Sequence, residues 1–146
     1  MSIKYTSDLI FDIYIKKYLI KDIDFSNKTD IEKYLKKLFK ILSKKYNLII
    51  EGFYNITIYI DKFYGIVLHL EKEMLDYYEY YKNQVDMRLL TIDTNFMYEV
   101  DDIPYYILDK VKIKIKENNI YLIIKESLTD LEMMKLLENS KLVYTS

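Results

Sequence analysis

The sequence predicts an α+β fold in which a mainly antiparallel sheet of about six to eight strands, built from hairpins, carries about two or three helices on one face. Two observations predict the strands: apolar and polar residues alternate in residues 47–72 and again in residues 110–126. A third predicts a helix, because apolar residues recur at three- and four-residue spacing in residues 29–46. The chain has 146 residues, so we expect a single domain spanning residues 1–146.

Residues 47–72 form the central hairpin of the predicted sheet. The even-numbered positions from Leu48 to Ile60 are almost all apolar, whereas the odd-numbered positions are mixed and polar. Successive side chains of a strand point to opposite faces, so this pattern predicts one buried face and one solvated face. Gly65 can adopt the positive φ of a tight turn. Gly52 interrupts the inward-facing set and predicts a bulge or a close approach by another element.

Residues 29–46 form the clearest predicted helix. Thr29 and Glu32 have the spacing of a capping box. One apolar stripe faces the core, and it consists of Ile31, Tyr34, Leu35, Leu38, Leu42 and Tyr46. Lysines gather on the opposite side of the helix, at Lys33, Lys36, Lys37, Lys40 and Lys44.

Residues 7–20 fit two patterns. Helical spacing joins Phe11, Tyr14 and Tyr18, with Ser7 as an N-cap. Alternation of Leu9 with the following apolar residues is instead typical of a strand. We favour the helix here and keep the strand as the alternative.

The remaining elements follow the same rules. Residues 85–92 and 96–100 are expected to pair as two strands around a turn at residues 93–95, and Pro104 ends that pairing. A third hairpin occupies residues 110–126. Its predicted turn is Asn118-Asn119, because Asn tolerates positive φ. This turn sets Glu117 opposite Ile120, Ile115 opposite Leu122 and Ile113 opposite Ile124.

The C-terminal part of the chain is expected to be a helix followed by an edge strand. Ser127 or Thr129 caps the helix, which runs over residues 130–138 and ends near Asn139. Its inward-facing residues are Leu131, Met134 and Leu137. A short edge strand is expected over residues 142–145.

Composition excludes several classes of function. The chain has no cysteine, so it forms no disulfide and no thiolate metal site. Its two glycines lie far apart in the sequence, so no Gly-rich phosphate loop exists and no cofactor is expected. No apolar run has the length of a membrane span, and Asp8 and Asp12 interrupt the apolar N-terminal run that a signal peptide needs. We therefore expect a cytoplasmic protein. Its richness in Ile, Lys, Asn and Tyr is typical of an AT-rich genome.

Two groups of residues are candidates for chemical sites. His69 is the only histidine, and its outward position beside Glu71 is what a general base with an orienting carboxylate needs. No nucleophile is fixed near it, so a surface histidine is the preferred interpretation. Glu99, Asp101 and Asp102, together with Asp93, could bind a hard cation, but their spacing matches no calcium loop. No catalytic residue and no metal ligand is assigned.

Two surfaces are candidates for partner binding. Tyrosine is enriched at protein interfaces, and an acidic tyrosine-rich segment contains Tyr77, Tyr78, Tyr80, Tyr81, Asp76 and Glu79. The lysine-rich face of the helix at residues 29–46 attracts phosphate backbones, but the net charge is only −1 and the chain has one arginine, Arg88. We therefore expect a small non-enzymatic interaction or regulatory domain that binds another protein or itself, through the tyrosine-rich segment or a sheet edge, with no membrane partner. A nucleic-acid-associated protein is the alternative, and an unrecognised enzyme centred on His69 the second.

Overall fold

The computed structural model describes residues 1–20, 23–73 and 85–144. The chain divides into two compact units: unit 1 contains Met1–Ile58 and Ile66–Ile92, and unit 2 contains Tyr59–Gly65 and Asp93–Ser146. One sheet has five strands and the other has four. The predicted α+β class and the mainly antiparallel pairing are confirmed, whereas the single sheet of six to eight strands is wrong. The expectation of one domain stays a prediction.

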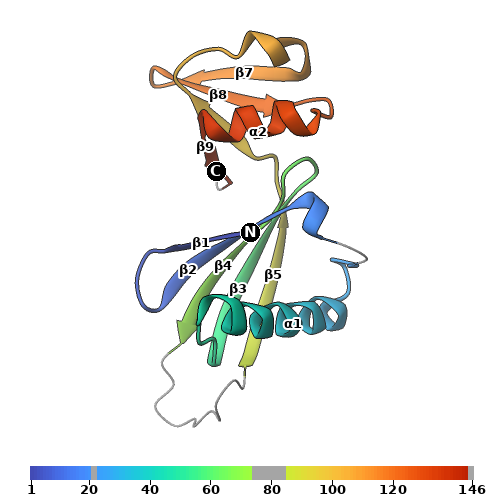
Figure 1. Ribbon diagram of the computed structural model, residues 1–146, viewed down its shortest axis with the longest axis vertical. Helices are drawn as coiled ribbons and strands as arrows, with labels where there is room; N and C mark the ends of the chain where they lie inside the picture. Colours follow the sequence, from blue (N-terminus) through green and yellow to red (C-terminus); the bar gives the residue numbers. More distant parts are fainter. Residues whose placement is uncertain (21–22, 74–84, 145–146) are drawn as a thin grey trace. The chain divides into compact units, whose positions relative to one another are not determined.

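The five-stranded sheet has the strand order β1-β2-β4-β3-β5 (Figure 1). Its strands are β1 (Ser2–Tyr5), β2 (Ile10–Lys16), β3 (Gly52–Asp61), β4 (Gly65–Glu73) and β5 (Val85–Asp93). β3 and β5 run in the same direction, with β4 antiparallel to β3, so this sheet is mixed. Sequence order and spatial order differ because β4 inserts between β2 and β3.

The predicted helix at residues 7–20 is wrong, because this segment contains strand β2 and the short 3₁₀ helix η1 (Lys17–Leu19). Strand β1 pairs antiparallel with β2, with Ile3 opposite Ile13 and Tyr5 opposite Phe11. The β-branched residues of this segment suit a pleated surface, and pairing with β1 satisfies their backbone groups.

Helix α1 (Lys28–Tyr46) lies across one face of this sheet (Figure 1). It begins earlier than predicted, because the Asn27 side chain accepts hydrogen bonds from the N–H groups of Thr29 and Asp30. Asn27 is therefore the N-cap, and the capping box predicted at Thr29 is wrong. The predicted apolar stripe is largely confirmed, although Tyr46 is exposed; the buried residues are Ile31, Leu35, Leu38, Phe39 and Leu42.

The central hairpin provides much of the core of unit 1. Its inward-facing set is buried as predicted: Tyr54, Ile56, Ile58, Ile66, Leu68 and Leu70. β3 begins at Gly52, so Gly52 lies at the start of a strand rather than in its middle. Its φ is +104°, and a Cβ there would lie 3.1 Å from Lys72 Cε. This neighbour is the end of a flexible side chain in the same hairpin, so the close approach by another element stays a prediction.

Unit 2 contains the four-stranded sheet of order β7-β8-β6-β9. Its elements are β6 (Met97–Val100), the 3₁₀ segment η2 (Tyr105–Lys110), β7 (Val111–Lys116), β8 (Asn119–Ile124), α2 (Asp130–Glu138) and β9 (Ser140–Val143). The predicted pairing of residues 85–92 with residues 96–100 is wrong, since β6 pairs with β8 and β9 while β5 belongs to the other sheet. Strands β8 and β9 occupy both edges of β6. The predicted C-terminal strand corresponds to β9, which begins two residues earlier than expected.

The β7–β8 hairpin forms in a register that differs from the prediction. Ile113 lies opposite Leu122 and Ile115 opposite Ile120. The turn residues are Glu117 and Asn118, with φ of +52° and +67°. The pairing is thus shifted by two residues, and an even shift leaves every side chain on its predicted face. Even so, Ile115, predicted inward, is 71% exposed.

Helix α2 has the predicted bounds and the predicted ends. Thr129 and Glu132 form a capping box, and Asn139 is the C-cap. The predicted inward face is wrong in part, because Leu131 and Met134 are 56% and 50% exposed. Leu136 is the buried residue of α2. Glu132 also faces inward, and its Oε1 lies 2.9 Å from Lys110 Nζ at the end of η2.

Candidate functional site

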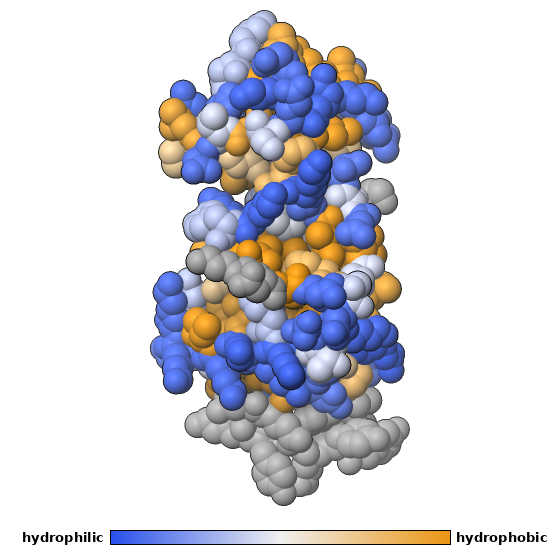
Figure 2. Space-filling view, turned by 90° about the vertical axis from the view of Figure 1, so that its right-hand side faces the viewer, coloured by the Kyte–Doolittle hydropathy of each residue, from blue (hydrophilic) through white to orange (hydrophobic). Residues whose placement is uncertain are grey.

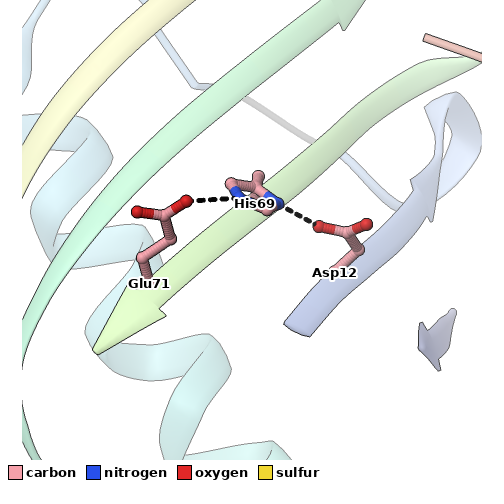
Figure 3. A network of polar contacts seen from close by, with 3 residues as sticks. All are labelled: Asp12, His69 and Glu71. Carbon is pink, nitrogen blue, oxygen red and sulfur yellow. Dashed lines mark hydrogen bonds and ion pairs between the residues drawn. The ribbon is translucent and has the colours of Figure 1, made fainter. Parts of the chain in front are cut away.

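His69 lies between two carboxylates on the face of β4 opposite Leu68 and Leu70 (Figure 3). Its Nδ1 is 2.6 Å from Asp12 Oδ1 of β2, and its Nε2 is 3.0 Å from Glu71 Oε1 of β4. Alternation explains the arrangement: Phe11 and Ile13 point into the core, so Asp12 points to the other face of β2. The Asp12 side chain is 9% exposed, whereas that of Glu71 is 54% exposed.

The two carboxylates favour the charged form of the ring. Burial lowers the pKa of His69, but hydrogen bonds and charge from Asp12 and Glu71 raise it, and the net result is a pKa above the ordinary value of 6.5. Only the imidazolium can donate from both nitrogens at once. A neutral ring would donate to one carboxylate and present a lone pair to the other.

Further polar groups share this face of the sheet. Lys4 of β1 is the cross-strand partner of Asp12. Asn55 of β3 donates a hydrogen bond to Glu73 of β4. The guanidinium of Arg88 lies 5.6 Å from the centre of the Phe53 ring. Positive and negative groups are therefore interleaved across the five strands, and the face carries no concentration of one sign.

This arrangement disfavours base catalysis. Both ring nitrogens are already engaged, so Glu71 would have to move before His69 could accept a proton from a substrate. Within residues 1–20, 23–73 and 85–144, no group of three or more His, Cys, Asp or Glu side chains could hold a metal ion. Glu99, which was weighed as a cation ligand, lies instead in β6, opposite Tyr121 and Lys141. The proximity of His69 and Glu71 follows from the sequence pattern, whereas the contact with Asp12 does not, because the sequence pattern of residues 7–20 favours a helix.

The two predicted partner surfaces differ in what the structure shows of them. The lysine-rich face of α1 is exposed at all of its predicted positions, namely Lys33, Lys36, Lys37, Lys40 and Lys44. Lys36 pairs with Glu32 at 3.1 Å. The acidic tyrosine-rich segment with Tyr77, Tyr78, Tyr80, Tyr81, Asp76 and Glu79 lies outside the described residues.

A third surface is the free edge of β5. This strand has nine residues and, in the described part of the chain, borders only β3. Leu90 and Ile92 are 58% and 36% exposed. Figure 2 views the molecule from the side on which β5 ends the sheet, and apolar side chains gather on that side of unit 1. The sequence pattern does not reveal this edge, because it predicts that residues 85–92 pair with residues 96–100.

Comparisons with protein-family models, with curated proteins and with solved structures find no match. Among the residues that the structure describes, no helix is long and apolar enough to cross a membrane. A proposal about function therefore rests on the residues and their geometry alone.

Proposed function

We propose that this chain is a small non-enzymatic interaction domain that binds a partner protein by adding a strand to the free edge of β5. The observation that supports it is the length and exposure of this edge: β5 has nine residues, and its last four are all exposed. An exposed edge strand presents unpaired backbone N–H and C=O groups to another chain. Leu90 and Ile92 add apolar contacts, which give specificity in strand addition.

The other sheet edges are less suited to this role. β1 and β9 have only four residues each. β7 carries Lys112, Lys114 and Lys116, all exposed. Lysine on an edge strand discourages pairing with another chain. β5 is thus a long edge strand without lysine, although Asp86 and Arg88 leave it partly charged.

The directions of the backbone N–H groups of β5 make a specific test possible. Thr94 N–H donates to Ile60 O at the end of β3. Alternate residues of a strand bond to the same neighbour, so the even-numbered residues of β5 direct their N–H groups toward β3. The odd-numbered residues, including Thr91, direct theirs toward the free edge. Proline is tolerated in an edge strand where its missing N–H would face solvent.

The test compares Thr91→Pro with Thr91→Ala in the full chain. A photo-crosslinking amino acid at position 90 is expected to capture a partner protein in the cells that make the chain, with adducts identified by mass. The photo-crosslinking amino acid placed at position 105, which is also exposed, is the control. Thr91→Pro should abolish the adducts and Thr91→Ala should preserve them. Equal yields in both variants, or no excess over position 105, would overturn the proposal.

The exposed lysine-rich face of α1 supports a second candidate, an association with nucleic acid. Counterion release makes such binding strongly dependent on salt. If the α1 face binds nucleic acid, changing Lys36, Lys37 and Lys40 together to Gln should weaken binding and flatten its salt dependence, while Thr91→Pro leaves both unchanged. The tyrosine-rich segment stays a proposed additional contact for a protein partner.

A further inference from the structure

We propose that Asp12, His69 and Glu71 form a proton-dependent clasp that holds β2, and with it the β1–β2 hairpin, against β4. Asp12 and His69 are 57 residues apart in the sequence, and their contact joins two strands that are not consecutive along the chain. The clasp is independent of the interaction proposed for β5, because β3 separates β4 from β5 in the sheet.

The clasp works because its two carboxylates have different surroundings. Asp12 is buried, so it needs a donor close by and cannot turn to bulk water. The Glu71 side chain is 54% exposed, so it can exchange its contact with His69 for contacts with water. When His69 loses its proton, we therefore expect the remaining N–H to stay on Nδ1 and face Asp12. Nε2 then presents a lone pair to Glu71, and the contact at 3.0 Å changes from attraction to repulsion. The contact with Glu71 therefore opens first. The contact with Asp12 also weakens, because a hydrogen bond from a neutral ring is weaker than one from an imidazolium, and this second change loosens the hold on β2.

The charged neighbours of the clasp limit this effect but do not cancel it. From β1, the exposed Lys4 is the cross-strand neighbour of Asp12. From β4 itself, Glu73 is occupied by Asn55. On β2, Tyr14 and Lys16 share the parity of Asp12, and on β3 the residues of matching parity, Asn55, Thr57 and Tyr59, include no carboxylate and no amine. Among the described residues, His69 is the cation that pairs with Glu71, so the proton on His69 is what holds this carboxylate in place.

The direction of the pH dependence follows from linkage. The folded-state pKa of His69 lies above the ordinary value of 6.5. A raised pKa means that the clasp contributes its full stability below the unfolded-state value and loses it as pH rises through the folded-state value. The β1–β2 hairpin should therefore be held most firmly in mildly acidic solution and loosen as the pH rises above neutrality.

The experiment uses the fact that His69 is the only histidine in the chain. Its ring protons give one NMR titration curve, and we expect a midpoint above 6.5 in the intact protein. Glu71→Gln should move the midpoint down. Glu73→Gln is the matched control, because it removes a carboxylate from the same face of the same strand, and it should move the midpoint much less. Both side chains are at least partly exposed, so neither variant should prevent folding.

Amide hydrogen exchange tests whether the clasp holds β2 against β4. After correction for the intrinsic rate, the protection of β2 amides should fall several-fold as His69 loses its proton, while that of β8 amides stays constant. His69→Gln should remove this pH dependence. Any of three results would overturn the clasp. They are a His69 titration midpoint at or below 6.5, equal midpoint shifts in Glu71→Gln and Glu73→Gln, and a protection of β2 amides that does not change when His69 loses its proton.

Discussion

At the scale of single residues, Asp61 shows how one buried carboxylate organises a junction. It lies at the end of β3 and is 7% exposed. Its Oδ2 accepts hydrogen bonds from the N–H groups of Phe63 and Tyr64, and its Oδ1 accepts one from Phe96, at 2.9, 2.7 and 2.9 Å respectively. Three backbone donors thereby offset the cost of burying its charge. The same carboxylate closes the β3–β4 turn and fixes the start of β6.

Tyr98, in the same unit, has a less favourable environment. It is completely buried, and within the described residues its hydroxyl has no hydrogen-bond partner. Burial, together with the charge of Asp61, raises the pKa of this hydroxyl. Burying a hydroxyl without a partner costs about 1–3 kcal/mol.

Tyr98→Phe should therefore increase the free energy of unfolding by about 1 kcal/mol, because it removes the unpaired oxygen and keeps the ring. Urea denaturation with equal slopes for both proteins measures the difference. Tyr105→Phe is the control, since Tyr105 is 82% exposed and its hydroxyl is free to meet water. A loss of stability in Tyr98→Phe would show that a bound water satisfies the hydroxyl.

At the scale of elements, the β7–β8 hairpin forms with an unusual turn residue. Both central residues of the turn have positive φ, as a type I′ turn requires. Asn118 tolerates this conformation, whereas Glu117 does so at a cost of about 1–2 kcal/mol. The alternative turn with Asn118 and Asn119 would avoid that cost, yet it would shift every pair of the ladder by two residues.

Glu117→Asn should stabilise the observed hairpin by about 0.5–1 kcal/mol, because Asn occupies the left-handed region more readily than Glu. Thermal or urea unfolding provides the measurement. Glu126→Asn, at an exposed position outside helices and strands, should change stability little. If Glu117→Asn gave no more stability than Glu126→Asn, the turn would not be at residues 117–118.

These elements also show what the sequence can reveal and where it stops. Several local signals were read correctly, namely the bounds of α2 and the buried parity of the central hairpin. Other local signals misled: Asn27 rather than Thr29 caps α1, and Ile115 is exposed although its alternation predicts an inward position. Pairing failed wherever it depended on partners far away in the sequence. Residues 85–92 and 96–100 look like one hairpin, but the edges of β6 are taken by β8 and β9.

The same difference between local patterns and contacts of distant segments applies to the residues of the candidate site. Glu71 is two residues from His69 on the same strand, so alternation predicts their proximity. Asp12 reaches His69 only because β4 inserts beside β2, and no local pattern encodes that insertion. The free edge of β5 was hidden for a related reason: a strand's edge is recognised only once all of its neighbours are known.

At the scale of the whole molecule, the β3–β4 hairpin belongs to both units. Residues Tyr59–Gly65, at the tip of the β3–β4 hairpin, belong to unit 2, whereas the rest of that hairpin belongs to unit 1. Within unit 2, this tip supplies the Asp61 carboxylate for Phe96 N–H. It also supplies two rings: Tyr64 lies 5.6 Å from Phe96 and Tyr59 lies 5.2 Å from Tyr144, measured between ring centres. Unit 2 is therefore incomplete without a segment that precedes it by some thirty residues in the sequence.

Two outcomes are expected from this arrangement. The full chain should unfold in one transition, with urea midpoints that coincide for amide signals of Ile56 in unit 1 and Leu122 in unit 2, because strands common to both units couple them. The isolated fragment 93–146 should fail to fold, since the N–H of Phe96 loses its buried acceptor and the aromatic cluster loses two rings. A longer fragment, 59–146, restores those groups and is the control: it should show more dispersed amide signals than 93–146. Separate midpoints for Ile56 and Leu122, or a well-dispersed spectrum from 93–146, would instead mean that unit 2 is an autonomous domain and that the expectation of a single domain is wrong.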